Sequence, residues 1–212
     1  MLATRIIAIR HGETAWNVDT RLQGHLDIAL NTKGLWQAEQ VAGALAGEAV
    51  DAIYSSDLLR AWHTASAIAQ TTGAQLVATQ ELRERCFGNF EGQTYAELEA
   101  QWPEAALRWR KREPDWAPPG GESLLALRQR IASTVDAFAS QHVGGQIVLV
   151  AHGGVMDVLY RLATGQELQA PRTWQLGNAA INRLLWTRQG VTLVGWGDTS
   201  HLEEPTLDEN ST

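Results

Sequence analysis

Two histidines directly follow short apolar segments that have the composition of buried strands. The segment 6–9 leads into Arg10 and His11, and the segment 147–151 leads into His152. Both segments are too short to span a membrane. An imidazole can act as a nucleophile or move a proton, and a guanidinium can hold an anion. Because open α/β sheets bind ligands where their strands end, we predict that the two imidazoles meet at one edge of a sheet.

The segments that would position these histidines alternate between strand and helix patterns. Apolar runs predict strands at 5–10, 52–55, 75–78 and 147–151, and a hairpin over 181–186 and 191–196. Apolar residues at helical spacing predict helices over 32–47, 57–72, 123–141 and 153–164, with N-caps at Asn31 or Thr32, Asp57 and Ser123. Because short links join most of these elements, we predict an α/β fold, a three-layer α-β-α sandwich around a mainly parallel sheet.

Residues 86–121 interrupt this alternation and are predicted to form a helical insertion over the strand ends. Thr94 and Glu97 have the spacing of a capping box, and Pro103 suits the first turn of a further helix. The insertion also holds three tryptophans, Trp102, Trp109 and Trp116. These rings suit either an aromatic lid over a substrate or the ordinary packing of amphipathic helices.

The composition is that of a globular protein. A hydrophobic fraction of 44% in 212 residues predicts a single domain over 1–212, with a polar tail over about 198–212. The net charge of -7 and the lack of a long basic run argue against nucleic acid or a membrane as partners. The single cysteine, Cys86, excludes an internal disulfide and favours a reducing compartment, for which the cytoplasm is the default. We expect no signal peptide, because the first apolar run is short and lacks a cleavage pattern.

The residues around both histidines resemble the signature of the histidine phosphatase superfamily, whose fold is also called phosphoglycerate mutase-like. The matching residues are, in order, 10–14, Trp16, Asn17, 22–24, Leu30, Gly34, Ala38, 55–58, Arg60, Ala61, Thr64, Ala65, 82–84, Gly88, 91–92, 120–123 and 151–154. This ordered set covers about residues 5–200 and is far more specific than a lone Arg-His-Gly. The resemblance implies a phosphomonoester hydrolase that forms a phosphohistidine intermediate on a small phosphorylated metabolite, with no metal or other cofactor.

The resemblance also implies a role for each residue of the reacting centre. His11 would be the nucleophile, with one neutral ring nitrogen aimed at phosphorus and the other held as N–H. Arg10 and Arg60 would clamp the phosphoryl oxygens with their paired donors. His152 would donate a hydrogen bond to the transferring group, and Gly153 would offer a backbone N–H at a helix N-terminus. Against this, a lone histidine is more often structural, and Arg60 could instead cap its helix or pair with a surface carboxylate.

Glu84 is the candidate general acid. One carboxyl group can protonate the leaving oxygen and later take a proton from the water that attacks the phosphohistidine. The family position singles out Glu84, whereas spacing alone would not separate it from Glu81 or Glu91 in the same polar loop.

Several further polar residues follow the nucleophile or precede the last strands. Asn17, Gln23 and Gly24 would bind phosphate oxygens from the loop after His11. We expect Glu13 to orient His11 or an arginine, rather than to touch the substrate. Asn178, just before the hairpin, is a weaker candidate for contact with a ring of the site.

Other classes of hydrolase lack their motifs in this sequence. Although six histidines are available, no His-Glu-x-x-His or His-x-His cluster exists, and no metal site is predicted. A cysteine phosphatase needs arginine six residues after its cysteine, and position 92 is glycine. No early Asp-x-Asp and no Gly-x-x-x-x-Gly-Lys loop is present. A non-catalytic phosphate-binding module is the alternative from a different class, although it would be expected to lack His11, Glu84 or His152.

Within the family, the sequence favours a phosphatase over a cofactor-dependent phosphoglycerate mutase. The segment 22–24 is similar to the phosphatase branch, and the segment after Glu84 lacks the arginine-rich run of mutases. The insertion carries four cations, Arg108, Arg110, Lys111 and Arg112. Helical spacing would spread these charges around the helix, and nearby carboxylates balance them. The sequence leaves open both the physiological substrate and whether the chain forms a homodimer.

Overall fold

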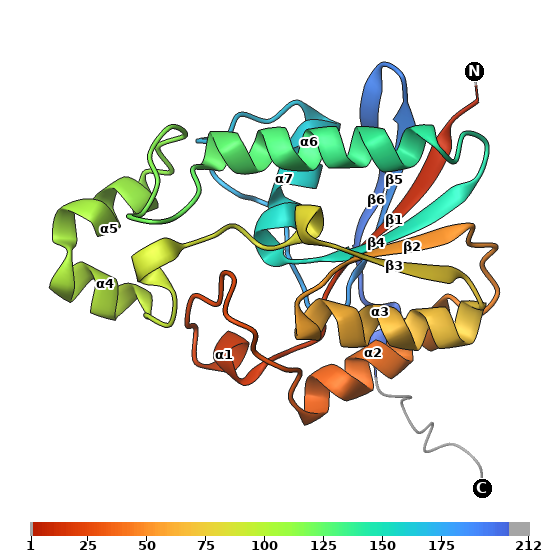
Figure 1. Cartoon of the computed structure of the whole chain (residues 1–212), viewed down its shortest axis with the longest axis horizontal. Helices are drawn as coiled ribbons and strands as arrows, with labels where there is room; N and C mark the ends of the chain where they lie inside the picture. The colour runs from red at the N-terminus through yellow and green to blue at the C-terminus, as the bar shows by residue number, and fades with distance from the viewer. Residues whose placement is uncertain (1, 204–212) are drawn as a thin grey trace, which may run out of the picture.

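The computed structural model describes residues 2–203, which form a six-stranded sheet with helices on both faces (Figure 1). The strands are β1 (Thr4–Arg10), β2 (Ala52–Ser56), β3 (Gln75–Thr79), β4 (Gln146–Ala151), β5 (Ile181–Thr187) and β6 (Gly190–Asp198). The α-helices are α1 (Ala15–Val18), α2 (Thr32–Ala44), α3 (Leu59–Thr72), α4 (Tyr95–Gln101), α5 (Pro103–Arg110), α6 (Leu124–Ser140) and α7 (Gly153–Thr164). Short 3₁₀ helices are η1 (Gln80–Leu82), η2 (Gly88–Phe90) and η3 (Ser200–Leu202).

The strands lie in the order β3-β2-β4-β1-β5-β6. Neighbours are parallel from β3 to β1, and antiparallel between β1 and β5 and between β5 and β6. The prediction of an α/β fold with a mainly parallel sheet is confirmed. In the register of the two central strands, Arg10 is paired with Ala151. His11 and His152 directly follow these two strands. The two residues therefore leave the sheet next to each other.

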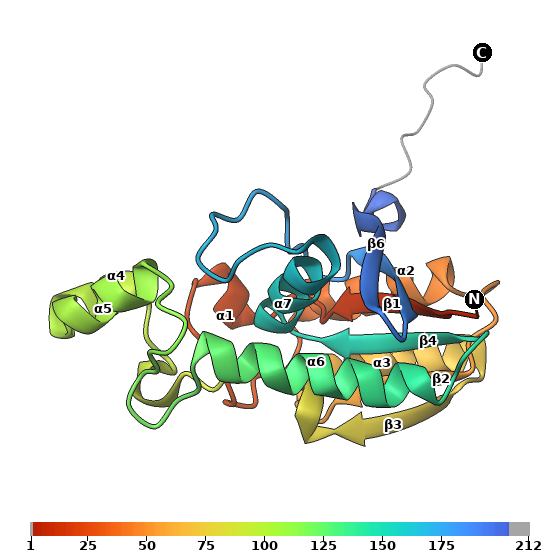
Figure 2. The same ribbon diagram turned by 90° about the horizontal axis from the view of Figure 1, so that it is seen from above.

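Alternate residues of β1 pack into two separate cores. Ile6 and Ala8 pack with α6 and α7, whereas Ile7 and Ile9 pack with α2 and α3. Figure 1 shows these helix pairs on opposite sides of the sheet, and Figure 2 shows β1 and β4 pointing toward the side where α1, α4 and α5 lie. A slip of one residue would exchange the two cores, so burial on both faces fixes the register that places the histidines.

Local capping sets where most of the helices begin. Asn31 and Ser123 accept backbone N–H groups at the starts of α2 and α6. Thr94 and Glu97 form the predicted capping box of α4, and Pro103 is the first residue of α5. The capping side chains bond within one helical turn, and Pro103 suits the first turn because it has no N–H to satisfy, so the sequence predicted these helix starts correctly.

The predicted cap of α3 is wrong. Leu58 occupies the N-cap without a side-chain hydrogen bond, and Asp57 lies outside the helix. The carboxylate of Asp57 is instead held by the guanidinium of Arg83 through two bonds of 2.7 and 2.6 Å. A distant cation therefore replaces the local capping contact, and it ties the start of α3 to the segment that follows η1.

Residues 86–121 extend to one end of the molecule, where α4 and α5 lie away from the sheet (Figures 1 and 2). Phe90 is the centre of this part, with ring centroids 5.9 Å from Trp102 and 5.8 Å from both Trp109 and Trp116. The tryptophans therefore pack the insertion, and Trp109 alone of the three also lines the pocket described below.

Part of the segment predicted as a polar tail forms a short 3₁₀ helix, η3. Leu202 of η3 packs against the core on the α2–α3 side of the sheet, so ordered structure continues past residue 198. The remainder of that tail, 204–212, lies outside the described residues. Among the helices of residues 2–203, none has the length and apolar character needed to span a membrane.

Candidate active site

His11 and His152 lie side by side at the carboxyl ends of β1 and β4, as the sequence predicted. Their ring centroids are 5.2 Å apart, and the side chains are 2% and 0% exposed. The backbone N–H of His11 donates to the carbonyl of Ala151 at 3.0 Å, which continues the strand pairing by one bond. The register of two strands, rather than a loop, brings the rings together.

A backbone carbonyl fixes the tautomer of His11. Nδ1 lies 2.6 Å from the carbonyl oxygen of Gly12. A carbonyl can only accept, so Nδ1 carries the hydrogen and Nε2 keeps its lone pair. Burial, assisted by the charges of Arg60 and Arg10, lowers the pKa of His11 well below its usual value. The ring is therefore neutral at pH 7 with Nε2 available, as attack on phosphorus requires.

The turn after the nucleophile is held from three sides. The N–H of Gly12 donates to Thr64 Oγ1 at 3.1 Å, and a Cβ on Gly12 would lie 2.4 Å from the carbonyl oxygen of Gly34. Only glycine permits this approach between the turn and α2. Asn178 donates to the carbonyl oxygen of His11 at 2.8 Å. It also donates to Asn17 Oδ1 at 3.4 Å, so its described contacts are with the backbone of the nucleophile and with Asn17, and not with a ring.

Arg10 and Arg60 flank the histidines, and part of each guanidinium is bound to backbone carbonyls. Arg10 donates to a carbonyl in the loop 165–180, and Arg60 donates to that of Gly24 at 2.8 Å. The Nε atoms of both arginines and Nδ1 of His152 are buried, and none has a hydrogen-bond partner within residues 2–203. Unpartnered buried nitrogens around a neutral imidazole are expected of a site that binds an anion.

Glu84 lies against the N-terminus of α7. Its Oε2 accepts the N–H of Gly154 at 3.0 Å, and its Oε1 accepts the N–H of Arg85 at 2.8 Å. Burial lowers the pKa of Arg60 to about 10 and also lowers that of Arg10, and Glu84 is the largest charge opposing the shift at both. The carboxylate is thus the principal counter-charge of the arginine clamp. A Cβ on Gly154 would lie 2.3 Å from Oε1, so glycine is required for this contact.

The other predicted phosphate ligands support the loop after His11. The side-chain oxygens of Asn17 and Gln23 accept from Thr14, whose hydroxyl lies 2.9 Å from Gln23 Oε1. Gly24 contributes a carbonyl that holds Arg60 rather than a donor. Contact of these three residues with phosphate remains a prediction.

The expected role of Glu13 is wrong. Its carboxylate accepts from Asn31 at 3.0 Å and pairs with Lys33 at 3.1 Å, both at the start of α2. The bond from Asn31 is the largest cause of its lowered pKa. At the second strand end, a Cβ on Gly153 would lie 3.5 Å from Arg10 Nε, so Gly153 lies beside the clamp, and its contact with phosphate stays a prediction.

A pocket of about 450 Å³ opens beside Arg10, Gly153 and Gly154. Three further arginines line it, Arg85, Arg112 and Arg172. Its apolar wall is formed by Phe87, Trp109, Leu124 and Leu127. Cations therefore surround both the histidines and the adjoining space, in a protein whose net charge is -7.

Sequence reasoning placed none of these three arginines at the site, and it expected Arg112 to be spread around its helix with the other cations of the insertion. Arg85 follows Glu84 directly, is 6% exposed and lies over the ring of Trp109, with burial lowering its pKa to about 10. Arg112 lies just beyond α5 at a φ of 53°, where it pairs with Asp157 at 2.7 Å. The position of Arg85 next to the candidate acid could have indicated that it lies near the site. No neighbouring motif in the sequence indicates this for Arg112 or Arg172.

The other cations of the insertion behave as the sequence predicted. Arg108 pairs with Glu113 at 2.6 Å and Arg110 with Glu99 at 3.2 Å. Only Arg112 departs from the expected spread around the helix. Within residues 2–203, no group of three or more His, Cys, Asp or Glu side chains is arranged to hold a metal ion.

A family model and several relatives match this chain along most of its length. The model, described as the histidine phosphatase superfamily (branch 1), matches residues 6–199. Phosphoglycerate mutase-like protein 4 of Arabidopsis thaliana is 40% identical over 203 residues, which are 94% of this chain and 87% of that protein. A metal-independent phosphoserine phosphatase of Arabidopsis thaliana is 36% identical over 202 residues, 94% of this chain and 83% of that protein. The solved phosphoserine phosphatase of Entamoeba histolytica, in complex with 3-phosphoglyceric acid, has a TM-score of 0.83 and 30% identity, covering 94% of this chain and 100% of that one.

Proposed function

Because the chain belongs to the histidine phosphatase superfamily (branch 1), we propose that it is a metal-independent phosphomonoester hydrolase with His11 as its nucleophile. The observation that carries this proposal is the bond from Nδ1 of His11 to the carbonyl of Gly12, which leaves a neutral Nε2 between two arginines. The unpartnered nitrogens of Arg10, Arg60 and His152 support an anionic group at the same place.

The proposed reaction has two steps. Nε2 of His11 attacks phosphorus, the bond from phosphorus to the leaving oxygen breaks, and Glu84 gives that oxygen a proton. Water then attacks the phosphohistidine, Glu84 takes its proton, and the phosphorus–nitrogen bond breaks to release phosphate. In both steps Arg10 and Arg60 stabilise the charge on the phosphoryl oxygens, and His152 supplies a further hydrogen bond.

The substrate is proposed to be a small phosphorylated acid. Arg85, Arg112 and Arg172 line the pocket next to the clamp, where the part of the substrate beyond the phosphate would lie. Paired guanidinium donors fit a carboxylate. Phosphoserine and 3-phosphoglyceric acid, which appear in the names of the relatives, both carry a carboxylate besides the phosphate. The single Cys86 is in keeping with a reducing compartment, and we propose the cytoplasm.

Replacement of the nucleophile tests the proposal. His11→Ala should abolish phosphate release and leave the fold intact, because no other side chain replaces the attacking nitrogen. The wild type should accumulate acid-labile, alkali-stable phosphate on His11 during turnover. His63→Ala, at an exposed position of α3, is the matched control and should keep full activity. Phosphate release by His11→Ala well above background would exclude this mechanism.

Cofactor-dependent phosphoglycerate mutase is the second candidate function. The same three pocket arginines favour it, since an intermediate with two phosphates needs cations beyond Arg10 and Arg60. We rank it second because Asp157 already pairs with Arg112 in this pocket.

Two assays on one preparation separate the candidates. We expect phosphate release from phosphomonoesters without bisphosphoglycerate, and little interconversion of 2- and 3-phosphoglycerate when it is added. Isomerisation that outpaces hydrolysis would reverse the ranking. Binding of phosphate with neither activity would instead indicate a non-catalytic module.

A further inference from the structure

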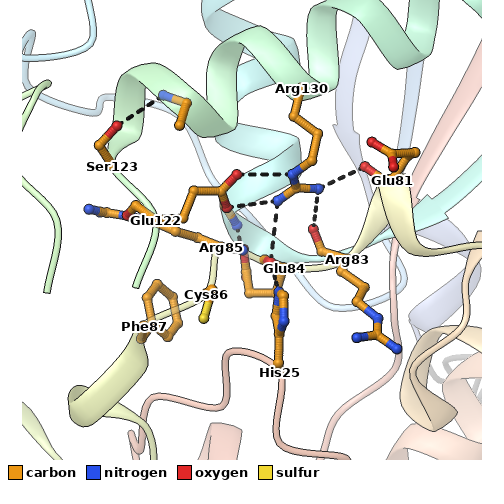
Figure 3. A network of polar contacts seen from close by, with 12 residues as sticks. His25, Glu81, Arg83, Glu84, Arg85, Cys86, Phe87, Glu122, Ser123 and Arg130 are labelled. Atoms are coloured by element: carbon orange, nitrogen blue, oxygen red, sulfur yellow. Dashed lines mark hydrogen bonds and ion pairs between the residues drawn. The ribbon is translucent and has the colours of Figure 1, made fainter. Parts of the chain in front are cut away.

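The guanidinium of Arg130, on α6, reaches the segment that ends on Glu84 (Figure 3). Nη1 donates to the carbonyls of Glu81 at 2.7 Å and Arg83 at 3.0 Å, and Nη2 donates to that of Glu84 at 3.4 Å. Nε and Nη2 also donate to the two carboxylate oxygens of Glu122, at 3.0 and 2.9 Å. These bonds use all five N–H donors of the guanidinium.

Two of the three carbonyls that Arg130 binds, those of Arg83 and Glu84, lie outside any strand or helix, whereas that of Glu81 is in η1. Residues 83–87 lie between η1 and η2 without regular structure. Carbonyls in such a segment need donors from elsewhere, and the guanidinium supplies them. From the other side, Nε2 of His25 donates to the carbonyl of Glu84 at 2.8 Å. The backbone of Glu84 is therefore held between Arg130 of α6 and His25, which lies in the loop after His11 (Figure 3).

Glu122 fixes the orientation of Arg130. The two side chains are 17% and 19% exposed, so solvent screens their pairing only in part. The backbone of Glu122 also contacts the same segment, because its N–H donates to Cys86 at 2.8 Å and its carbonyl accepts from Arg85 Nε at 2.7 Å. A lysine could not reproduce this planar, five-donor arrangement.

We propose that Arg130, oriented by Glu122, is a positioning residue for proton transfer by Glu84. It holds the backbone of Glu84 so that the carboxyl group stays at the N-terminus of α7, beside Arg10 and Arg60. Neither Arg130 nor Glu122 lines the pocket next to Arg10, so neither is placed to bind substrate there. Loss of the contact displaces the acid and leaves the phosphoryl clamp in place. The proposal rests on the role of Glu84 in the proposed function.

Substrates with different leaving groups test it. Nitrophenolate, the leaving group of nitrophenyl phosphate, departs without a proton, whereas the serine oxygen of phosphoserine needs one. For Arg130→Gln, kcat/KM should fall on the order of tenfold more with phosphoserine than with nitrophenyl phosphate. Arg130→Lys should not restore the ratio, because it lacks the donor geometry. Adding Arg130→Gln to Glu84→Gln should cause no further change in the ratio, since the acid is already absent.

Two controls separate positioning from folding. Arg128→Gln alters an arginine on the same helix whose side chain makes no hydrogen bond or ion pair within residues 2–203, and the ratio should stay at the wild-type value. If Arg130→Gln does not fold, Glu122→Gln removes the orienting charge, keeps the guanidinium and should shift the ratio in the same direction.

The outcomes distinguish this proposal from the proposed function. Equal losses on both esters in the folded Arg130 variant or in Glu122→Gln, with Glu84→Gln still selective, would overturn the positioning role alone. Equal losses in Glu84→Gln would overturn both the acid role and the positioning role. Absence of phosphate release by the wild type would overturn the proposed function, and the positioning role with it.

Discussion

The hydroxyl of Ser56 lies 2.8 Å from Nε2 of His152, and both side chains are fully buried. Burial, together with Arg60 and other nearby cations, lowers the pKa of His152 well below its usual value, so the ring is neutral. We predict that the hydroxyl donates to Nε2 and so puts the ring hydrogen on Nδ1, which has no hydrogen-bond partner in residues 2–203. The serine would then decide which nitrogen of His152 can donate to a phosphoryl group.

Ser56→Ala should therefore lower kcat more than it raises KM. The loss should be about tenfold, less than the roughly hundredfold cost of removing a stabilising donor outright. Nitrogen NMR of labelled histidine should show a change in the tautomer of His152. Ser55→Ala is the matched control, because that buried hydroxyl donates to the backbone carbonyl of Ser56. An unchanged tautomer in Ser56→Ala would contradict the assignment.

The neutral histidines should make stability depend on pH between 7 and 5. In the unfolded chain both rings take up a proton near pH 6.5, whereas His11 and His152 resist it in the folded protein. The free energy of unfolding is therefore not reduced by these two histidines above pH 6.5. Below that pH it falls by up to about 1.4 kcal/mol per pH unit for each histidine. Urea unfolding at several pH values measures this. His152→Asn should reduce the slope and His63→Gln should not, while a flat free energy would contradict the prediction.

Activity should survive a chelator. Arg10, Arg60 and the two histidines provide the donors and charge that a metal ion would otherwise supply to the phosphoryl group. We expect full phosphate release in excess chelator, and inhibition by vanadate, which resembles the phosphoryl group in transfer. Loss of activity with chelator and its recovery with a divalent ion would contradict this prediction.

Arg172 should act on the acidic part of the substrate. Arg172→Gln should raise KM several-fold for phosphoserine and change it little for nitrophenyl phosphate, because the guanidinium lines the pocket beyond the clamp. Arg172 is exposed, so the effect should weaken at high salt. Arg188→Gln, in the exposed turn between β5 and β6, is the control. Equal KM changes for both esters would count against the acidic-substrate proposal.

Gly154→Ala should displace the acid directly. The added methyl would begin 2.3 Å from Glu84 Oε1, so the carboxyl group must move. Phosphoserine turnover should fall by more than nitrophenyl phosphate turnover. Gly43→Ala, in α2, is the control, since a Cβ there meets nothing within 4 Å. A Gly154→Ala variant with wild-type rates on both esters would show that the close contact is dispensable.

The sequence by itself predicted the features that depend on neighbours along the chain. The apolar runs of β1 and β4 identified buried strands, and Asn31, Thr94 and Ser123 marked helix starts within one turn. The His–Gly pairs after two strands also predicted that His11 and His152 meet, because parallel strands end at the same edge of a sheet.

The tertiary structure alone decided which distant groups complete the site. Asp57 was predicted to cap α3, but it pairs with Arg83 instead. Glu13 was predicted to orient His11 or an arginine, but it pairs with Lys33. The convergence of Arg85, Arg112 and Arg172 on one pocket depends on the paths of three separate segments. Electrostatic attraction depends on the distance between charges in space, and not on their separation along the chain. Residue types and spacing therefore cannot indicate which partner a flexible cation or carboxylate will reach.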